Sequence, residues 1–386
     1  MSKKMTIAMF GHKRIPSREG GVEIVVENLS TRMAAGGHQV TCYNRRGHHV
    51  SGAEFDALKT CTYQGVRIRS VWTLDKKGLA AMTASLSAAV CTAFSRADVV
   101  HIHAEGPAFM CWLPKLLRKR VVVTIHGLDW KREKWKQGFA SKYIHAGEKM
   151  AVRHADEIIV LSRNVQDYFR TTYGRETVWI PNGVCRPERR IAKQITDKFG
   201  LWKDGYILFL GRLVPEKGIH YLIEAFRGTK TNKKLVIAGG KSGTDAYSRK
   251  LNELAQGDDR ILFTGFVQGK LLEELYSNAY VYVLPSDVEG MPLSLLEAMS
   301  YGNCCLVSSI PECTEVVEDK AAVFEKGNVD ALRQALQTLC DHPAQAAAYK
   351  ENASDFICDK YNWDDVTKKT LELYDESFAD QQVSVS

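Results

Sequence analysis

LPSDVEGMPLSLLEAM, residues 284–299, is the stretch that decides the fold of this chain. The run before it, Tyr280 to Leu284, is short, β-branched and aromatic, which is typical of a buried strand. Pro292 stands where a helix can begin, a position that tolerates proline because its missing N–H has no helical partner. Apolar residues then recur at helical spacing up to Gly302, which ends the helix. We therefore predict a strand, a tight turn and a helix.

Two glutamates flank the start of this predicted helix: Glu289 in the turn and Glu297 inside the helix. At about 1.5 Å of rise per residue, eight positions span roughly 12 Å if helical throughout. A pair of carboxylates that shares one glycosidic bond lies roughly 5 to 9.5 Å apart. We therefore expect the two to hold different parts of one elongated ligand, with a phosphate at the helix start between them. A surface loop glutamate and a solvated helix glutamate remain the alternative.

The length, charge and cysteine pattern of the chain indicate its general class of protein. A chain of 386 residues is too long for one compact core and predicts two domains. Its net charge of +7 suits an anionic small molecule or an acidic membrane surface, and gives little support for a nucleic-acid partner. Ten cysteines without metal-ligand spacing indicate a reduced, cytoplasmic protein, and the N-terminus does not have a secretory signal pattern. The apolar segment from Leu79 to Phe94 is shorter than a membrane span, so we expect a buried amphipathic helix there.

The first half begins with a predicted strand, Thr6 to Phe10, and a basic loop that reaches Gly20 and Gly21 at the start of a helix. A basic, glycine-bearing loop at a helix start predicts a phosphate cradle, although a plain turn also fits. The loop does not have the Gly-x-Gly-x-x-Gly pattern, which counts against a nicotinamide or flavin dinucleotide cofactor.

Three further buried strands are predicted at 99–103, 121–125 and 157–161. Strands that alternate with helices imply a parallel, doubly wound sheet, in which ligands lie beyond the carboxyl ends of the strands. His101, His103, His126 and Asp129 fall at those ends. They fit satisfied structural groups, a zinc or iron site, or a histidine that faces a sugar or phosphate. We favour the last and predict no metal, because no pair has helical metal-ligand spacing.

The second half repeats this architecture. The first domain is predicted at 1–185, a second Rossmann-like domain at 200–362 after a polar linker at 186–200, and a final helix within 363–386. Five strands are predicted in the second domain, at 206–210, 235–238, 261–264, 280–284 and 305–308. Arg212 and Lys217 lie between the first of these strands and the next helix. An arginine fork and a lysine point charge there are well placed to hold a diphosphate.

A basic and aromatic segment, Trp130 to Lys136, lies near the end of the first domain. Basic residues interleaved with tryptophan can rest at a lipid headgroup surface, and a solvated basic helix fits equally well. Peripheral membrane contact is therefore one of two open interpretations.

The motifs together resemble glycosyltransferase family 4. The residues that carry the resemblance are Gly20, Gly21, His126, Gly211, Arg212, Lys217, Gly218, Thr264, Gly265, Phe266, Val267, Glu289 and Glu297. The resemblance spans nearly the whole chain and implies the GT-B fold, two Rossmann-like α/β domains that face each other across a nucleotide-sugar cleft. It also implies that the last helix crosses back onto the first domain.

The resemblance assigns donor-binding roles in the second domain. Arg212 and Lys217 would bind the donor diphosphate, Glu289 the donor sugar and Glu297 the ribose hydroxyls. The backbone around Val267 would meet the base. The helix start, with Gly290, Met291 and Leu293, would bind the donor as well. Many relatives carry Phe-Gly where this chain has Met291-Pro292, so which amides hold the phosphate stays open.

In the first domain the resemblance implies that Gly20 and Gly21 close on the donor phosphates and that His126 lies near the anomeric carbon. Residues 14–23 and 124–130 look like those of bacterial rhamnosyltransferases of polysaccharide assembly. That likeness implies dTDP-rhamnose as donor and a lipid-linked saccharide as acceptor, at the inner face of the plasma membrane. Family membership further implies retention of anomeric configuration, with no metal and no cofactor besides the donor. A sugar-nucleotide epimerase or hydrolase and a silent nucleotide-sugar-binding protein remain alternatives.

Overall fold

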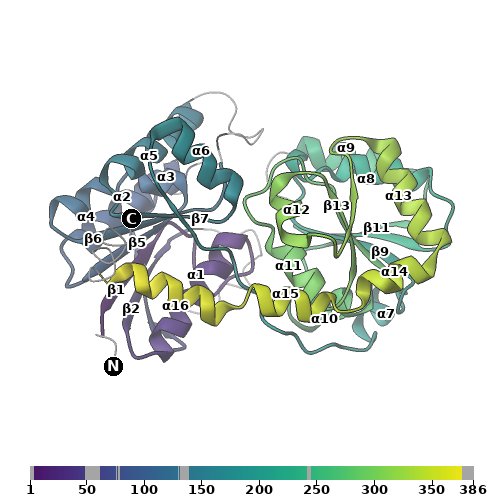
Figure 1. Ribbon diagram of the computed structural model, residues 1–386, viewed down its shortest axis with the longest axis horizontal. Coiled ribbons are helices and arrows are strands. Elements are labelled where there is room, and N and C mark those ends of the chain that lie inside the picture. The colour runs from purple at the N-terminus through teal and green to yellow at the C-terminus, as the bar shows by residue number, and fades with distance from the viewer. Residues whose placement is uncertain are drawn as a thin grey trace. The chain divides into compact units, whose positions relative to one another are not determined.

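The computed structural model describes residues 4–47, 61–74, 76, 79–128, 130, 139–240 and 245–375. The chain forms two compact units, which Figure 1 shows as ribbons. The first comprises Met1–Asn182 and Trp363–Ser386, and the second Gly183–Asn362. The stretch 186–200, where we expected a linker, belongs to the second unit and contains a short helix, α7 (Gln194–Phe199).

The described residues of the first unit form an eight-stranded sheet in the order β3-β4-β2-β1-β5-β6-β7-β8. Its strands are β1 (Thr6–Phe10), β2 (Gln39–Arg45), β3 (Thr62–Tyr63), β4 (Val66–Val71), β5 (Val99–His103), β6 (Arg120–Ile125), β7 (Glu157–Val160) and β8 (Val178–Trp179). All neighbours are parallel except β3 and β4. The prediction of a parallel, doubly wound sheet is confirmed.

Helices cover both faces of this sheet. They are α1 (Gly21–Ala35), α2 (Leu79–Ala93), α3 (Glu105–Ala108), α4 (Trp112–Leu116), α5 (Phe139–His154), α6 (Arg163–Tyr173) and α16 (Trp363–Tyr374). Phe10 and Ile102 share one core with Ala88 of α2. Because side chains alternate along a strand, His101 points to the opposite face. There its Nδ1 lies 2.6 Å from the Tyr374 hydroxyl of α16.

The prediction that the apolar helix after residue 79 is buried is wrong in part. A helix forms at Leu79–Ala93, but the expected burial is wrong for its large apolar side chains. Ala84, Ala88 and Ala89 face the core, whereas Leu86 is 46% exposed. The small residues allow close packing on the sheet, so the larger ones lie on the outer side. An apolar composition alone does not reveal which face has a packing partner.

The second unit contains a six-stranded sheet in the described residues, in the order β11-β10-β9-β12-β13-β14, with all neighbours parallel. Its strands are β9 (Tyr206–Leu210), β10 (Lys234–Ala238), β11 (Ile261–Gly265), β12 (Val281–Leu284), β13 (Cys304–Ser308) and β14 (Ala322–Phe324). Its helices after α7 are a 3-10 turn η4 (Pro215–Lys217), α8 (Ile219–Arg227), α9 (Asp245–Ala255), α10 (Gly269–Asn278), α11 (Leu293–Ser300), α12 (Pro311–Val317), α13 (Val329–Asp341), α14 (Pro343–Lys350) and α15 (Ala353–Lys360).

All five strands predicted in the second unit are found. Four of them are largely buried and form continuous apolar runs, whereas β11 lies at the edge of the sheet and is only half-buried. The fold is thus a two-domain α/β protein with parallel sheets. Among the described residues, none of the helices has the length and apolarity needed to cross a membrane.

Candidate functional site

Lys217 and Glu289 meet at the carboxyl edge of the second sheet. Lys217 ends the turn η4 after β9, and Glu289 lies in the turn after the neighbouring strand β12. The Lys217 Nζ is 2.5 Å from the Glu289 Oε1, and the two side chains are only 14% and 8% exposed. Two residues that were assigned to different parts of a donor therefore form one nearly buried ion pair.

Ser286 fixes the direction of this carboxylate. Its Oγ donates to the same Glu289 Oε1 at 2.6 Å, and Ser286 is fully buried. The Ser308 hydroxyl of β13 in turn donates to the Ser286 carbonyl at 2.5 Å. Glu289 is thus held directly by Lys217, which follows β9, and indirectly through Ser286 by Ser308 of β13. Strands β9 and β13 are the two neighbours of β12.

A glycine lets the two loops come together. Gly218 follows Lys217 in the left-handed region (φ +64°), and a Cβ on it would lie 2.0 Å from the Pro285 carbonyl oxygen. The backbone N–H of Asp287 donates to the Glu216 carbonyl at 2.8 Å. Because a side chain at position 218 would collide with backbone, only glycine allows this close approach.

Arg212 lies on the same loop as Lys217 and is half-buried. A second glycine contact supports that loop, since a Cβ on Gly239 would lie 1.8 Å from the Gly211 carbonyl oxygen. Val267 is buried and follows β11, the strand next to β10 at the edge of the sheet. The turns after β9, β10, β11 and β12 therefore share one edge, at which Arg212, Lys217, Val267 and Glu289 all lie.

Helix α11 begins one residue later than expected. Pro292 is its N-cap and Leu293 its first residue, so the predicted start at Pro292 is corrected. The Pro292 side chain cannot accept a hydrogen bond, and the first N–H groups of a helix have no partner within it. Gly290 and Met291 are both buried and lead into this helix start. The positive end of the helix dipole, which favours an anion, therefore lies directly after the turn that carries Glu289.

Glu297 lies one turn into α11, and α10 holds its carboxylate. The Tyr276 hydroxyl donates to the Glu297 Oε2 at 3.1 Å. Burial raises the pKa of Tyr276 well above its usual value, and the nearby Glu297 charge adds to this. Tyr276 therefore stays a neutral donor, and it fixes Glu297 separately from the Lys217–Glu289 pair.

In the first unit, Gly20 is the N-cap of α1 and Gly21 its first residue, as predicted. Glu23 lies in the first turn of the helix and is buried; its Oε1 accepts the Lys13 N–H at 2.8 Å. A Cβ on Gly20 would meet the Glu23 Oε2 at 2.5 Å. The helix start therefore already has a carboxylate beside it, so an incoming phosphate would meet a negative charge there.

The histidines at the carboxyl edge of the first sheet form hydrogen bonds rather than a ligand cluster. The His103 Nδ1 lies 3.1 Å from the His126 Nε2. Both nitrogens of His101 are engaged, because its Nε2 lies 2.7 Å from the Thr124 Oγ1 and its Nδ1 near Tyr374. Burial lowers the pKa of His103 well below its usual value, so this histidine is neutral. The described residues contain no group of three potential metal ligands, and Asp129 lies outside them.

The structure thus brings together the second-unit residues and places Gly20, Gly21 and His126 within the first unit. Sequence reasoning missed Ser286 and Tyr276. Ser286 could have been found, because it precedes Glu289 by three residues in the same turn. Tyr276 gave no local signal, since it is 21 residues from its partner Glu297.

The basic and aromatic segment at 130–136 lies outside the described residues except for Trp130. The Trp130 Nε1 donates to the Glu148 Oε2 at 3.2 Å. The predicted membrane contact of this segment stays a prediction.

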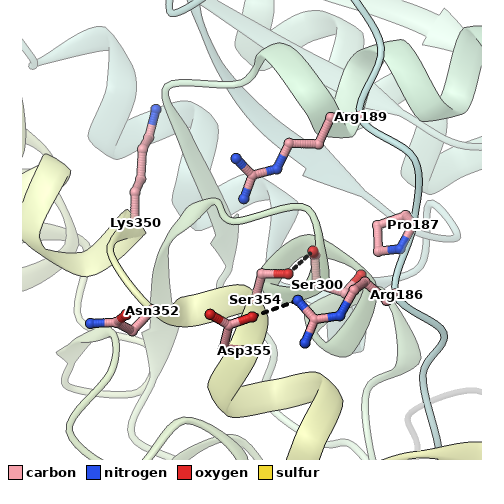
Figure 2. A pocket seen from close by; sticks show the side chains of 8 residues that line it. All are labelled: Arg186, Pro187, Arg189, Ser300, Lys350, Asn352, Ser354 and Asp355. Atoms are coloured by element: carbon pink, nitrogen blue, oxygen red, sulfur yellow. Dashed lines mark hydrogen bonds and ion pairs between the residues drawn. The ribbon is translucent and has the colours of Figure 1, made fainter.

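A separate cavity of about 300 Å³ lies elsewhere in the second unit (Figure 2). It is lined by Arg186, Pro187, Arg189, Ser300, Lys350, Asn352, Ser354 and Asp355. Two of its cations already have anionic partners: Arg186 bonds to Asp355 at 2.5 Å and Lys350 to Asp204 at 2.5 Å. Ser300 is the last residue of α11, so the cavity lies at the opposite end of that helix from Gly290. It does not belong to the candidate site.

Comparisons with known proteins identify the class to which the chain belongs. Residues 193–356 match the family of glycosyl transferases group 1, and residues 19–185 match Glycosyltransferase Family 4. The two matches cover most of both units. The protein is therefore a glycosyltransferase. More narrowly, the chain belongs to the GT-B glycosyltransferases that combine these two domains.

Individual relatives are distant but span the chain. An uncharacterized glycosyltransferase, MJ1607 of Methanocaldococcus jannaschii, is 26% identical over 96% of this chain and 98% of its own. Sucrose-phosphate synthase from Thermosynechococcus elongatus has a similar structure, with a TM-score of 0.80 at 22% identity over 97% of this chain and 100% of its own. Anabaena Alr3699/HepE in complex with UDP-glucose matches with a TM-score of 0.77 at 16% identity, over 99% of this chain and 100% of its own.

Proposed function

We propose that this glycosyltransferase moves a hexose from a nucleoside diphosphate sugar to a saccharide acceptor, with retention of the anomeric configuration. The observation that carries the proposal is the Lys217–Glu289 pair at the carboxyl edge of the second sheet, beside the start of α11. This edge offers cations and helix N–H groups to a diphosphate and carboxylates to hydroxyl groups. The UDP-glucose bound by the Anabaena protein of similar fold supports a donor of this class.

In this proposal, each group of residues binds a different part of the donor. Arg212 and Lys217 bind the diphosphate with the N–H groups around Gly290, Met291 and Leu293. Glu289 accepts hydrogen bonds from the sugar, and Glu297 from the ribose. Because Tyr276 and Ser286 already orient the two carboxylates, little ordering is needed when the donor binds. The backbone near Val267 meets the base.

Charge stabilisation is the main catalytic contribution in this scheme. The bond between the anomeric carbon and the phosphate oxygen breaks, and its electron pair goes to the phosphate. The acceptor hydroxyl forms the new bond on the same face, and its proton passes to the leaving phosphate oxygen. Arg212, Lys217 and the α11 start stabilise the negative charge that develops. For the first unit, we propose that the backbone of Gly20 and Gly21 approaches the phosphates despite the Glu23 carboxylate beside it, and that His126 lies near the anomeric carbon.

We further propose that the reaction needs no metal ion, since Arg212 and Lys217 supply the positive charge that a divalent ion would otherwise provide. Turnover should survive EDTA. Complete loss in EDTA that a divalent ion restores would contradict this part of the proposal.

The proposed identity of the donor and acceptor rests on the likeness of residues 14–23 and 124–130 to polysaccharide rhamnosyltransferases. We propose dTDP-rhamnose as the first donor to test, with a lipid-linked saccharide at the inner face of the plasma membrane as acceptor. Donor choice can turn on few residues, so UDP-sugars belong in the same test.

The experiment is a panel of nucleoside diphosphate sugars, scored first by protection against thermal unfolding, because a ligand that binds the folded state raises the unfolding temperature. The protecting donors are then incubated with and without saccharide acceptors. Sugar transfer that needs the acceptor supports the proposal. Isomerised or hydrolysed donor without acceptor would instead indicate an epimerase or hydrolase. Protection without any turnover would indicate a silent binding protein.

A further inference from the structure

Exposed large apolar side chains gather on one part of the first unit. Seven of the eleven found in the described residues lie on α2, on α4 or directly after them. We name these seven the α2–α4 surface: Leu79, Leu86, Val90, Phe94, Trp112, Leu116 and Leu117. Helices α2 and α4 pack against each other, and both belong to the outer layer of the unit (Figure 1).

The α2 part of this surface is one helical face. Leu79, Leu86, Val90 and Phe94 are separated by seven, four and four positions, which is helical spacing along one side. Phe94, just past the helix end, is 77% exposed. No charged residue occurs from position 79 to position 95. A helix in the outer layer normally presents a polar side to water, so an uncharged helix of this kind indicates a contact surface.

Four basic residues lie near the ends of α2 and α4, together with Asp98 and Asp156. Arg96 follows Phe94, and Arg118 follows Leu117; both are exposed. Lys115 and Lys119 lie on and after α4 and are half-buried. Lys115 pairs with Asp156, and the Lys119 Nζ donates to the Ser95 carbonyl at 2.8 Å. Apolar side chains beside several Lys and Arg residues match the apolar interior and anionic headgroups of a lipid surface.

We propose that the α2–α4 surface docks on an anionic lipid bilayer, with its apolar side chains below the headgroups and the cations on the phosphates. A second copy of this chain fits less well, because a two-fold axis would bring two positive rims together. This inference extends the proposed function, since a lipid-linked acceptor lies at such a surface. It is tested without donor or acceptor, so its failure is distinguishable from failure of the proposed reaction.

The experiment is co-sedimentation of the full chain with phosphatidylcholine vesicles, with or without phosphatidylglycerol. The wild type should bind the anionic vesicles, and salt should weaken the binding. Leu86→Gln with Phe94→Gln should lower the affinity by about tenfold or more, because both side chains leave water on binding. Leu116→Gln, at a position 70% exposed, provides an independent variant on α4. Ile191→Gln is the matched control, since Ile191 is 84% exposed in the second unit, and it should bind as the wild type does.

Two further measurements complete the test. Arg96→Gln with Arg118→Gln should weaken binding to anionic vesicles and reduce its salt dependence. Light scattering gives the oligomeric state of each variant, and circular dichroism verifies that it is folded. The proposal would be overturned if the wild-type protein did not bind anionic vesicles. It would also be overturned if the folded Leu86 and Leu116 variants bound them as the wild type does. A wild-type dimer that the same substitutions dissociate, without vesicle binding, would assign the surface to a second copy and also overturn it.

Discussion

The Lys217 Nζ and the Glu289 Oε1 lie 2.5 Å apart, across two loops that follow the neighbouring strands β9 and β12. The residues are 72 positions apart in sequence. Their ion pair holds both side chains in place in the absence of a donor, and an incoming phosphate would have to share Lys217 with the carboxylate. Removing either partner therefore changes the surroundings of the other.

A double-mutant cycle tests this coupling. Lys217→Ala should lower the free energy of unfolding by about 3 kcal/mol, because it leaves the nearly buried Glu289 carboxylate without its cation. In the background of Glu289→Gln the same change should matter much less, since no buried charge is stranded. Urea denaturation of the wild type, both single variants and the double variant gives the coupling. Additive losses would show that the pair makes no net contribution.

The two glutamates should differ in their kinetic effects. Glu289→Gln should mainly lower kcat, because its contact orients the reacting sugar, whereas Glu297→Gln should mainly weaken donor binding. Tyr276→Phe removes one hydrogen bond to Glu297, so it should raise the donor Kd by about fivefold and leave kcat unchanged. Steady-state kinetics and nucleotide titrations measure both effects. The same phenotype for all three variants would contradict the separate roles.

Gly218 offers a test of loop geometry with a matched control. Gly218→Ala places a Cβ at a position 2.0 Å from the Pro285 carbonyl oxygen and also at positive φ. Gly257→Ala has a similar φ of +83° but nothing within 4 Å of its Cβ. The control should lose only about 1–2 kcal/mol of stability from the backbone conformation. Gly218→Ala should lose clearly more and also weaken donor binding. Equal losses measured by urea denaturation would mean that the two loops can separate without penalty.

The strands could be predicted closely where apolar runs end at polar loops, as at β1, β5 and β9. The strands β3, β4, β8 and β14 were not predicted. Strands β3 and β8 have two residues each, and so few residues show no periodicity. The helix α2 was expected to be buried, but its large apolar side chains are exposed. The expectation failed because the sequence alone does not show which helical face has a packing partner.

The candidate site was predictable only in part. The loop carrying Arg212 and Lys217 and the turn carrying Glu289 each follow a recognisable strand. Their contact depends on the order of the sheet, in which β12 lies beside β9 while β10 and β11 lie on the other side. That order follows from tertiary packing rather than from any local pattern. The same holds for the Tyr276 contact to Glu297.

Buried histidines make the first unit sensitive to acid. Burial lowers the pKa of His101 to about 3 and that of His12 to about 4, against about 6.5 in the unfolded chain. Below about pH 6.5 the unfolded chain therefore binds protons that the folded chain does not, and stability falls as the pH falls. Each histidine contributes about 1.4 kcal/mol per pH unit in that range and nothing above it.

The variant His101→Gln tests this pH dependence, because glutamine can bond to Thr124 and Tyr374 but does not titrate. The free-energy difference between wild type and variant should shift by about 2 kcal/mol in favour of the variant between pH 7 and pH 5. Comparing the two proteins cancels the titration of other groups. Parallel urea-denaturation results across that range would show that His101 takes up its proton in the folded state.

Titration calorimetry with a nucleoside diphosphate tests the central claim, that the second unit binds the donor diphosphate, most directly. UDP or dTDP should bind the wild type and bind Arg212→Ala and Lys217→Ala at least about tenfold more weakly, because each variant loses a charge-assisted contact. The control Lys230→Ala changes an exposed lysine of the same unit after α8 and should bind as the wild type does. The nucleoside alone should bind the wild type and both site variants with similar affinity, since only the phosphates contact these side chains. Unchanged diphosphate affinity in both site variants would contradict the assignment of this edge as the donor site.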